Sequence, residues 1–164
     1  MNKAVLKQLR DRYMSEQKIL CTGNPNREYT IAHAVKQVFP SADFISLSNG
    51  WDLRGELTEF KKKIQTYNIF INASLIENGC QLRLLNAAAD VLKYGHLFNV
   101  GSCTEYQPDN RREYADSKRE LRDRSLELYS YRLRTTHIVL GGLQDPEHPN
   151  WMPADRVADT IKWI

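Results

Sequence analysis

The stretch that decides the fold is residues 18–38, KILCTGNPNREYTIAHAVKQV. It begins with an apolar run, Lys18–Thr22, which predicts a buried β-strand. A turn rich in Gly, Asn and Pro follows at residues 23–26. The next apolar residues recur at the helical spacing i, i+3, i+4 and i+7: Ile31, Ala34, Val35 and Val38. With Pro40 ending the helix, the stretch predicts one strand–turn–helix unit.

This pattern continues along the chain. Apolar runs predict four more strands, at Asp43–Leu47, Asn68–Ala73, His96–Gly101 and Thr136–Gly141. Helical periodicity predicts a leading helix and four later ones, at Lys3–Tyr13, Leu57–Tyr67, Leu82–Leu92, Arg111–Arg132 and Pro153–Ile164. Helices that alternate with near-continuous apolar strands are typical of a parallel sheet covered on both faces. The sequence therefore predicts an α/β fold, a Rossmann-like doubly wound sheet in three layers.

Length and composition narrow the class of protein. The 164 residues, 41% apolar and 26% charged, predict one globular domain spanning 1–164. No apolar run approaches the length of a transmembrane helix, and the charged N-terminus lacks a signal core. Three cysteines without metal-binding spacing indicate a reducing, cytoplasmic protein with no metal site.

The segments that follow the predicted strands are polar or rich in glycine. In an open parallel sheet, ligands bind beyond the carboxyl ends of the strands. Thr22 and Gly23 end the first strand, and the helix after them offers free N–H groups to a phosphate. A plain strand-to-helix turn would look the same, so this piece alone is weak.

Tyr114 and Lys118 have the spacing i and i+4, which places them on one side of a helix. An ammonium beside a phenol favours the phenolate, and such a tyrosine can exchange protons near neutral pH. The spacing alone is expected by chance in a chain with this many tyrosines and lysines. Its context is more specific, because Ser102 closes the preceding strand.

The order of these motifs along the chain resembles that of the short-chain dehydrogenase/reductase family, over about Lys18 to Ile164. The matching pieces are CTGNPN at 21–26, WDL at 51–53, INAS at 71–74, FNVGS at 98–102, YADSK at 114–118, VLGGL at 139–143 and RVADTIKWI at 156–164. The resemblance implies a dinucleotide-binding domain that transfers a hydride between nicotinamide and a small carbonyl or alcohol substrate. Ser102 would hold the substrate oxygen, Tyr114 would exchange its proton, and Lys118 would bind the ribose and favour the phenolate. Asn78 is the nearest match to an expected active-site asparagine on the helix before the fourth strand.

The same resemblance implies the cofactor contacts. Thr22 and Gly23 would line the pyrophosphate, Asp52 and Leu53 the adenine, and Asn72 and Ala73 the adenosine side, while Gly142 would approach the nicotinamide. Further contacts are expected at Asn24, Asn26, Arg27, Ser48 and Ser74. No carboxylate follows the second strand before Asp52, and Arg27 can reach a 2′-phosphate, which favours NADP over NAD.

Two departures from the family pattern keep a second hypothesis open. Arg27 and Tyr29 occupy the second and third glycine positions of the phosphate loop, and the substrate-covering elements are reduced. A dinucleotide-binding regulatory or scaffold protein that has lost turnover fits these departures. The loop at residues 144–153 is the candidate substrate lid, and a plain connector is the alternative.

The remaining signals favour other uses less strongly. The basic residues of 111–134 are mixed with acids, as on a solvated helix, so nucleic-acid binding is a weaker hypothesis. Cys103 has no histidine placed beside it by the sequence, which disfavours a thiol nucleophile. The family often assembles through the helices flanking the fourth strand, and Leu82–Leu92 offers an apolar side, so a homodimer or homotetramer is expected.

Overall fold

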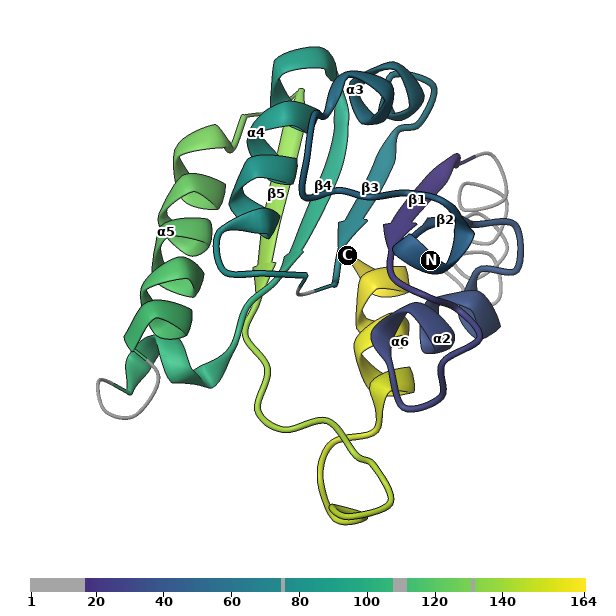
Figure 1. The fold of residues 1–164 in the computed structure, drawn as a ribbon, viewed down its shortest axis with the longest axis vertical. Helices are drawn as coiled ribbons and strands as arrows, with labels where there is room; N and C mark the ends of the chain where they lie inside the picture. Colours follow the sequence, from purple (N-terminus) through teal and green to yellow (C-terminus); the bar gives the residue numbers. More distant parts are fainter. Residues whose placement is uncertain (1–16, 75, 108–111, 131) are drawn as a thin grey trace, which may run out of the picture.

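The structure is a computed structural model that describes residues 17–74, 76–107, 112–130 and 132–164. Its five strands form one parallel sheet in the order β2-β1-β3-β4-β5 (Figure 1). The strands are β1 (Ile19–Thr22), β2 (Asp43–Ile45), β3 (Ile69–Asn72), β4 (Gly95–Val100) and β5 (Leu133–Ile138). The α/β, Rossmann-like fold predicted from the sequence is confirmed.

The strand order changes direction between β1 and β3. The chain adds β2 on one side of β1, then returns to place β3 on the other side. Loops that leave β1 and β3 therefore diverge at the carboxyl edge of the sheet, where doubly wound folds bind their ligands.

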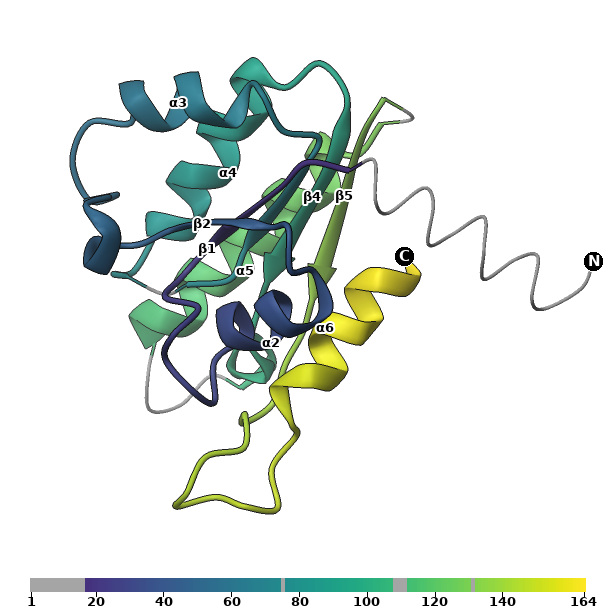
Figure 2. The same ribbon diagram turned by 90° about the vertical axis from the view of Figure 1, so that its right-hand side faces the viewer.

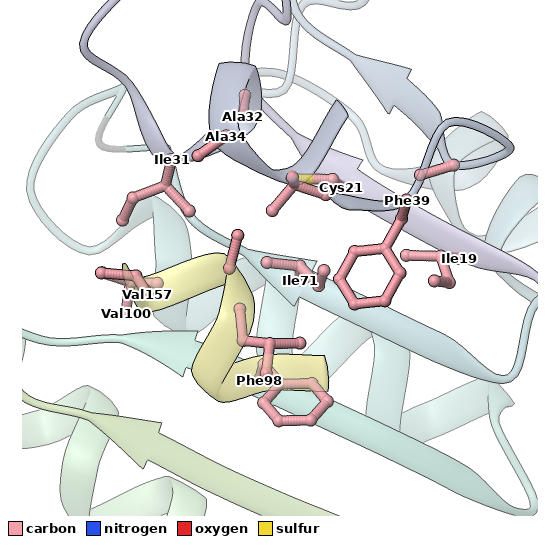
Figure 3. Packing of buried hydrophobic residues seen from close by; sticks show 14 of the residues in the cluster. Ile19, Cys21, Ile31, Ala32, Ala34, Phe39, Ile71, Phe98, Val100 and Val157 are labelled. Atoms are coloured by element: carbon pink, nitrogen blue, oxygen red, sulfur yellow. The ribbon is translucent and has the colours of Figure 1, made fainter. Parts of the chain in front are cut away.

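Helices cover the two faces of the sheet (Figures 1 and 2). On one face lie α2 (Ile31–Val38) and α6 (Ala154–Trp163), and on the other α3 (Thr58–Ile64), α4 (Cys80–Val91) and α5 (Arg112–Leu128). Figure 3 shows the buried cluster on the α2–α6 face, to which Ile71 and Phe98 of the sheet and Val157 of α6 belong. The buried cluster on the opposite face includes Phe60, Phe70 and Leu84. Burial of both faces explains the nearly continuous apolar strands.

Several predicted boundaries are wrong. The second strand ends at Ile45 rather than Leu47, and the helix after it ends at Ile64 rather than Tyr67. The fifth strand is Leu133–Ile138 rather than 136–141, because its partner β4 ends at Val100, which pairs with Ile138. The charged helix ends at Leu128 rather than Arg132. Short 3₁₀ helices, η1 (Leu47–Asn49) and η2 (Cys103–Tyr106), were not predicted. The predicted helix Lys3–Tyr13 lies outside the described residues.

The apolar side of α4 is used within the chain. Leu84, Leu85 and Ala88 are fully buried against the sheet. The apolar side of Leu82–Leu92, which was expected to contact a second copy, is therefore mostly buried in the core of this chain.

Across the described ranges, none of the helices has the length and hydropathy needed to cross a bilayer.

Candidate functional site at the carboxyl edge of the sheet

A buried hydroxyl joins the loops that diverge at the crossover. Thr22 Oγ1 accepts the N–H groups of Ala73 at 2.8 Å and Ser74 at 2.9 Å. Thr22 is completely buried. Its side chain therefore fixes the β1 loop to the β3 loop, and it does not face a ligand as the resemblance implies.

Gly23 is required by the turn that follows. Its φ is +128°, a conformation that L side chains rarely adopt. A Cβ there would lie 2.7 Å from both Ala32 Cβ and Ser74 Oγ. The missing side chain lets the β1 loop approach α2 and the β3 loop closely, in the wall of the crevice at the crossover.

This crevice contains a hollow of about 270 Å³ beside the N-terminus of α2. Its walls include Gly23, Asn24, Arg27, Tyr29, Ile31, Ala73 and Ser74. The Thr30 hydroxyl caps the helix by accepting the N–H of His33. Arg27 is exposed, and among the described residues its guanidinium has no ion-pair partner. A free cation and a helix N-terminus at one hollow suit an anionic group such as a phosphate.

Tyr29 has a backbone conformation that is typical of glycine. Its φ is +58°, and it is the one non-glycine residue with positive φ in the described chain. Its side chain is half exposed and borders the hollow. The loop thus retains a glycine-like shape and adds an aromatic ring at its rim.

A second hollow of about 290 Å³ adjoins the first and shares Gly23, Asn24 and Ser74 with it. Asp52, Leu53, Trp51 and Ser46 also line it. Arg54 Nε and Nη2 each donate to the Asp52 carboxylate at 2.8 Å. These hydrogen bonds hold the pKa of Asp52 at about 2.

Two of the predicted cofactor contacts that line neither hollow, Ser48 and Asn26, lie in exposed turns. The Ser48 hydroxyl lies 2.8 Å from that of Ser46, within η1. The Asn26 N–H donates to Asn24 Oδ1 at 2.9 Å, in the turn after β1. Both residues are exposed and serve local turn geometry.

The second part of the site lies beyond β4. Lys118 of α5 is 4% exposed, and its ammonium donates to Gln81 Oε1 and, at 2.9 Å, to the Val100 carbonyl. Lys118 Nζ also lies 5.4 Å from the centre of the Tyr114 ring. Burial lowers the pKa of Lys118 to about 8, although the charge of Glu105 opposes this shift. The predicted i, i+4 pair does meet, next to the end of β4.

Ser102 begins the turn η2, two residues beyond Val100. Its Oγ accepts the N–H of Thr104 at 3.3 Å and lies 3.0 Å from the Thr104 hydroxyl. Ser102 and Tyr114 are both half-buried. Asn78 lies in an exposed turn before α4, not on a helix as the resemblance implies. Instead, α4 contributes Gln81 to the site.

A network of buried amide side chains fixes Gln81, the hydrogen-bond partner of Lys118. Gln81 Nε2 donates to the Asn72 carbonyl at 2.8 Å, and Asn72 Nδ2 donates to Asn99 Oδ1 at 3.0 Å. Asn99 Nδ2 in turn donates to Ser125 Oγ at 3.0 Å. Asn72 is thus structural, contrary to its implied ligand contact. Asn99 could have predicted this buried network from the sequence, because an amide side chain inside an apolar strand needs buried hydrogen-bond partners.

The nicotinamide end of the expected site is partly covered. A Cβ on Gly142 would collide with the Trp151 indole, so this ring packs directly over the glycine. Trp151 also stacks on His148, with ring centres 3.8 Å apart. Leu143 and Met152 pair across the loop. The predicted lid, residues 144–153, therefore packs through Trp151 on Gly142, directly before its first residues.

Comparison with known proteins identifies the fold. No protein-family profile and no curated protein sequence matches the chain. Among solved structures, a short-chain dehydrogenase/reductase (glucose/ribitol dehydrogenase) of Brucella melitensis aligns with a TM-score of 0.67 at 11% identity, over 90% of this chain and 88% of that one. The 3-alpha-hydroxysteroid dehydrogenase of Pseudomonas sp. B-0831, complexed with NADH, aligns at 0.61 and 14%, over 89% of each chain. The bulky-bulky ketone specific alcohol dehydrogenase of Comamonas testosteroni aligns at 0.65 and 15%, over 88% of this chain and 80% of that one. The chain has the fold of short-chain dehydrogenases/reductases.

Proposed function

We propose that the chain binds a nicotinamide dinucleotide at the β1–β3 crossover and acts as an oxidoreductase of the short-chain dehydrogenase/reductase type on a small carbonyl or alcohol. The fit of the phosphate end supports this proposal. Gly23 lies in the wall of the hollow, and the α2 N-terminus offers free N–H groups and positive charge beside it. The bound nicotinamide would supply or accept the hydride.

One observation carries the proposal: buried Lys118 lies against Tyr114 where β4 leads into Ser102. The Lys118 ammonium uses two hydrogens on Gln81 and Val100. In the protonated state its third hydrogen can bind a ribose hydroxyl. Tyr114 would exchange the proton of the substrate oxygen, and Ser102 would hold that oxygen by a hydrogen bond.

The adenosine end favours NADP over NAD. Arg54 already engages the Asp52 carboxylate, the first acid after β2, so Asp52 is a poor acceptor for a ribose hydroxyl. Arg27 is free to pair with a 2′-phosphate. Arg27→Gln is expected to weaken NADPH binding about tenfold and NADH binding much less.

Titration of the purified protein with NADPH and NADH, followed by nicotinamide fluorescence, tests the proposal. Saturable binding of either cofactor, followed by oxidation of NADPH or NADH with members of a carbonyl panel, is expected. Failure of both to bind at millimolar concentration would overturn it.

A specific observation favours a second candidate, a dinucleotide-binding scaffold without turnover. Tyr29 borders the phosphate hollow and Trp151 covers Gly142, so both ends of the expected cofactor site are narrowed. A scaffold would bind the cofactor, yet no substrate of the panel would oxidise it, and Tyr114→Phe would change nothing.

Self-association through α4 and α5 is a further part of the proposal. Since the apolar side of α4 packs on the sheet, the contact would rest on the outer side of α5, where Leu126 is largely exposed. Sedimentation at micromolar concentration should show a dimer or tetramer that Leu126→Asp dissociates. A monomeric wild type would contradict this.

A further inference from the structure

A second buried charged group lies beside the Tyr114–Lys118 pair. Glu105 of η2 is 3% exposed, and its Oε2 lies 2.9 Å from His137 Nε2 of β5. Glu105 Oε1 and His137 Nδ1 are also buried, and neither has a hydrogen-bond partner among the described residues. The resemblance gives neither residue a role. Burial of a carboxylate in this way is costly unless another charge compensates it.

Backbone geometry places this pair next to the proposed site. A Cβ on Gly101 would collide with His137 Nε2 and lie 3.0 Å from Glu105 Oε2. Gly101 stands between Val100, whose carbonyl binds Lys118, and Ser102. Arg119 of α5 also donates to the Glu105 carbonyl at 3.0 Å. One short segment thus connects Lys118, Glu105 and Ser102.

The charges in this region are unbalanced unless Glu105 and Lys118 compensate each other. The direct partners of the Lys118 ammonium are neutral: Gln81 Oε1 and the Val100 carbonyl. The direct partner of Glu105 is His137, and burial lowers the pKa of that imidazole, which keeps it neutral at pH 7. The other groups facing this region come from α5: the Tyr114 phenol beside Lys118, Arg119, which binds the Glu105 carbonyl and is ion-paired to Asp116, and Arg122, whose charge acts on both Glu105 and His137. Arg122 is ion-paired to Asp123. Lys118 and Glu105 are therefore the buried opposite charges.

We propose that Glu105, held in place by His137, is a positioning residue for the oxidoreductase site: its buried carboxylate is the counter-charge that keeps Lys118 protonated. The inference rests on the proposed function for its catalytic meaning. The effect of Glu105 on the protonation of Lys118 does not depend on that function, since it is a property of the protein without cofactor. Loss of the Glu105 charge should make Lys118 lose its proton, and with it the third N–H, at lower pH.

Glu105→Gln removes the charge, while its amide oxygen can still accept the His137 N–H. The control is Glu120→Gln, the same charge change at an exposed position of α5. Titration of the lysine Cε signals by NMR, without cofactor, measures Lys118 directly, with its signal identified by absence in Lys118→Met. We expect the pKa of Lys118 to fall by about one unit in Glu105→Gln and to stay unchanged in Glu120→Gln. An unchanged pKa in Glu105→Gln would overturn the proposal.

The pH dependence of NADPH binding separates this inference from the proposed function. If both are right, the pH at which affinity is half lost moves down in Glu105→Gln by the same amount as the pKa of Lys118. If that pKa falls but no cofactor binds to any variant, the role of Glu105 is supported and the proposed oxidoreductase function fails.

A reciprocal experiment covers the case in which Glu105→Gln does not fold. Lys118→Met leaves the Glu105 carboxylate buried without its counter-charge. Adding Glu105→Gln to Lys118→Met should therefore raise the urea midpoint of unfolding. A midpoint that falls on adding Glu105→Gln would overturn the proposal, because it would show that the carboxylate does not depend on Lys118.

Discussion

The ammonium group of Lys118 lies 5.4 Å from the centre of the Tyr114 ring, one helical turn away on α5. Hydrogen bonds to Gln81 and Val100 hold this buried ammonium in place. The pair therefore lies on the side of α5 that faces the sheet, not on its solvated side. The proposed chemistry depends on this placement, because a ligand above Tyr114 would meet a fixed cation.

Tyr114→Phe should abolish turnover while leaving cofactor affinity nearly unchanged. The variant removes only the phenol oxygen and keeps the ring beside Lys118. We expect the rate with the best carbonyl substrate to fall at least about 100-fold, as for loss of a general acid. Tyr129→Phe is the control, since Tyr129 is exposed beyond the end of α5. Equal rates for wild type and Tyr114→Phe would exclude Tyr114 as the proton donor.

The buried lysine predicts how stability depends on pH. The pKa of Lys118 is about 8 in the folded chain and 10.5 in an ordinary lysine. Between these values the unfolded chain binds more protons, so this group makes the folded state more stable as pH rises through that window. Relative to Lys118→Met, the wild type should gain about 2 kcal/mol in unfolding free energy between pH 7 and 10. Urea unfolding at both pH values measures this, and a difference that does not change with pH would show that Lys118 is not buried as a charge.

Gly23→Ala should damage both stability and binding. Its Cβ would meet Ala32 and Ser74 at 2.7 Å, and the φ of +128° disfavours any side chain. We expect a loss of about 2–3 kcal/mol and a marked loss of cofactor affinity. Gly55→Ala is the matched control, because a Cβ there meets nothing within 4 Å. If both variants unfold at the same urea concentration, the close approach at Gly23 is wrong.

Tyr29→Gly should strengthen cofactor binding. The backbone at Tyr29 already has φ of +58°, which glycine adopts without strain, and the substitution removes the ring from the rim of the phosphate hollow. NADPH affinity is expected to rise about threefold or more, with stability changed by less than about 1 kcal/mol. Weaker binding would mean that the ring contacts the cofactor instead of obstructing it.

The layers of the fold could be predicted because they depend on local patterns. The run Lys18–Thr22 and the helical spacing of Ile31 to Val38 each report burial by their own periodicity, and both elements form as predicted. The end of the fifth strand depends instead on where β4 stops, a property of a distant segment. The Tyr114–Lys118 pairing was predictable from helix geometry alone.

The partners of Lys118 were not predictable in the same way. Gln81 of α4 accepts a hydrogen bond from it, Glu105 of η2 acts on it only through its charge, and neither has a spacing relation to Lys118 in the sequence. Thr22 and Asn72 were expected to face a ligand, but tertiary packing turns both into buried hydrogen-bonding groups. Polar residues at strand ends indicate an active edge, whereas the direction of each side chain is set by the assembled sheet.

Backbone amide NMR during titration with NADPH tests the central claim most directly, because it reports where the cofactor binds. We expect saturable shifts at Gly23, Ala32, Ala73 and Ser74, and at the segment around Ser102. Shifts confined to the opposite end of the strands, around Tyr94 and Arg134, or no shifts at millimolar NADPH, would contradict it.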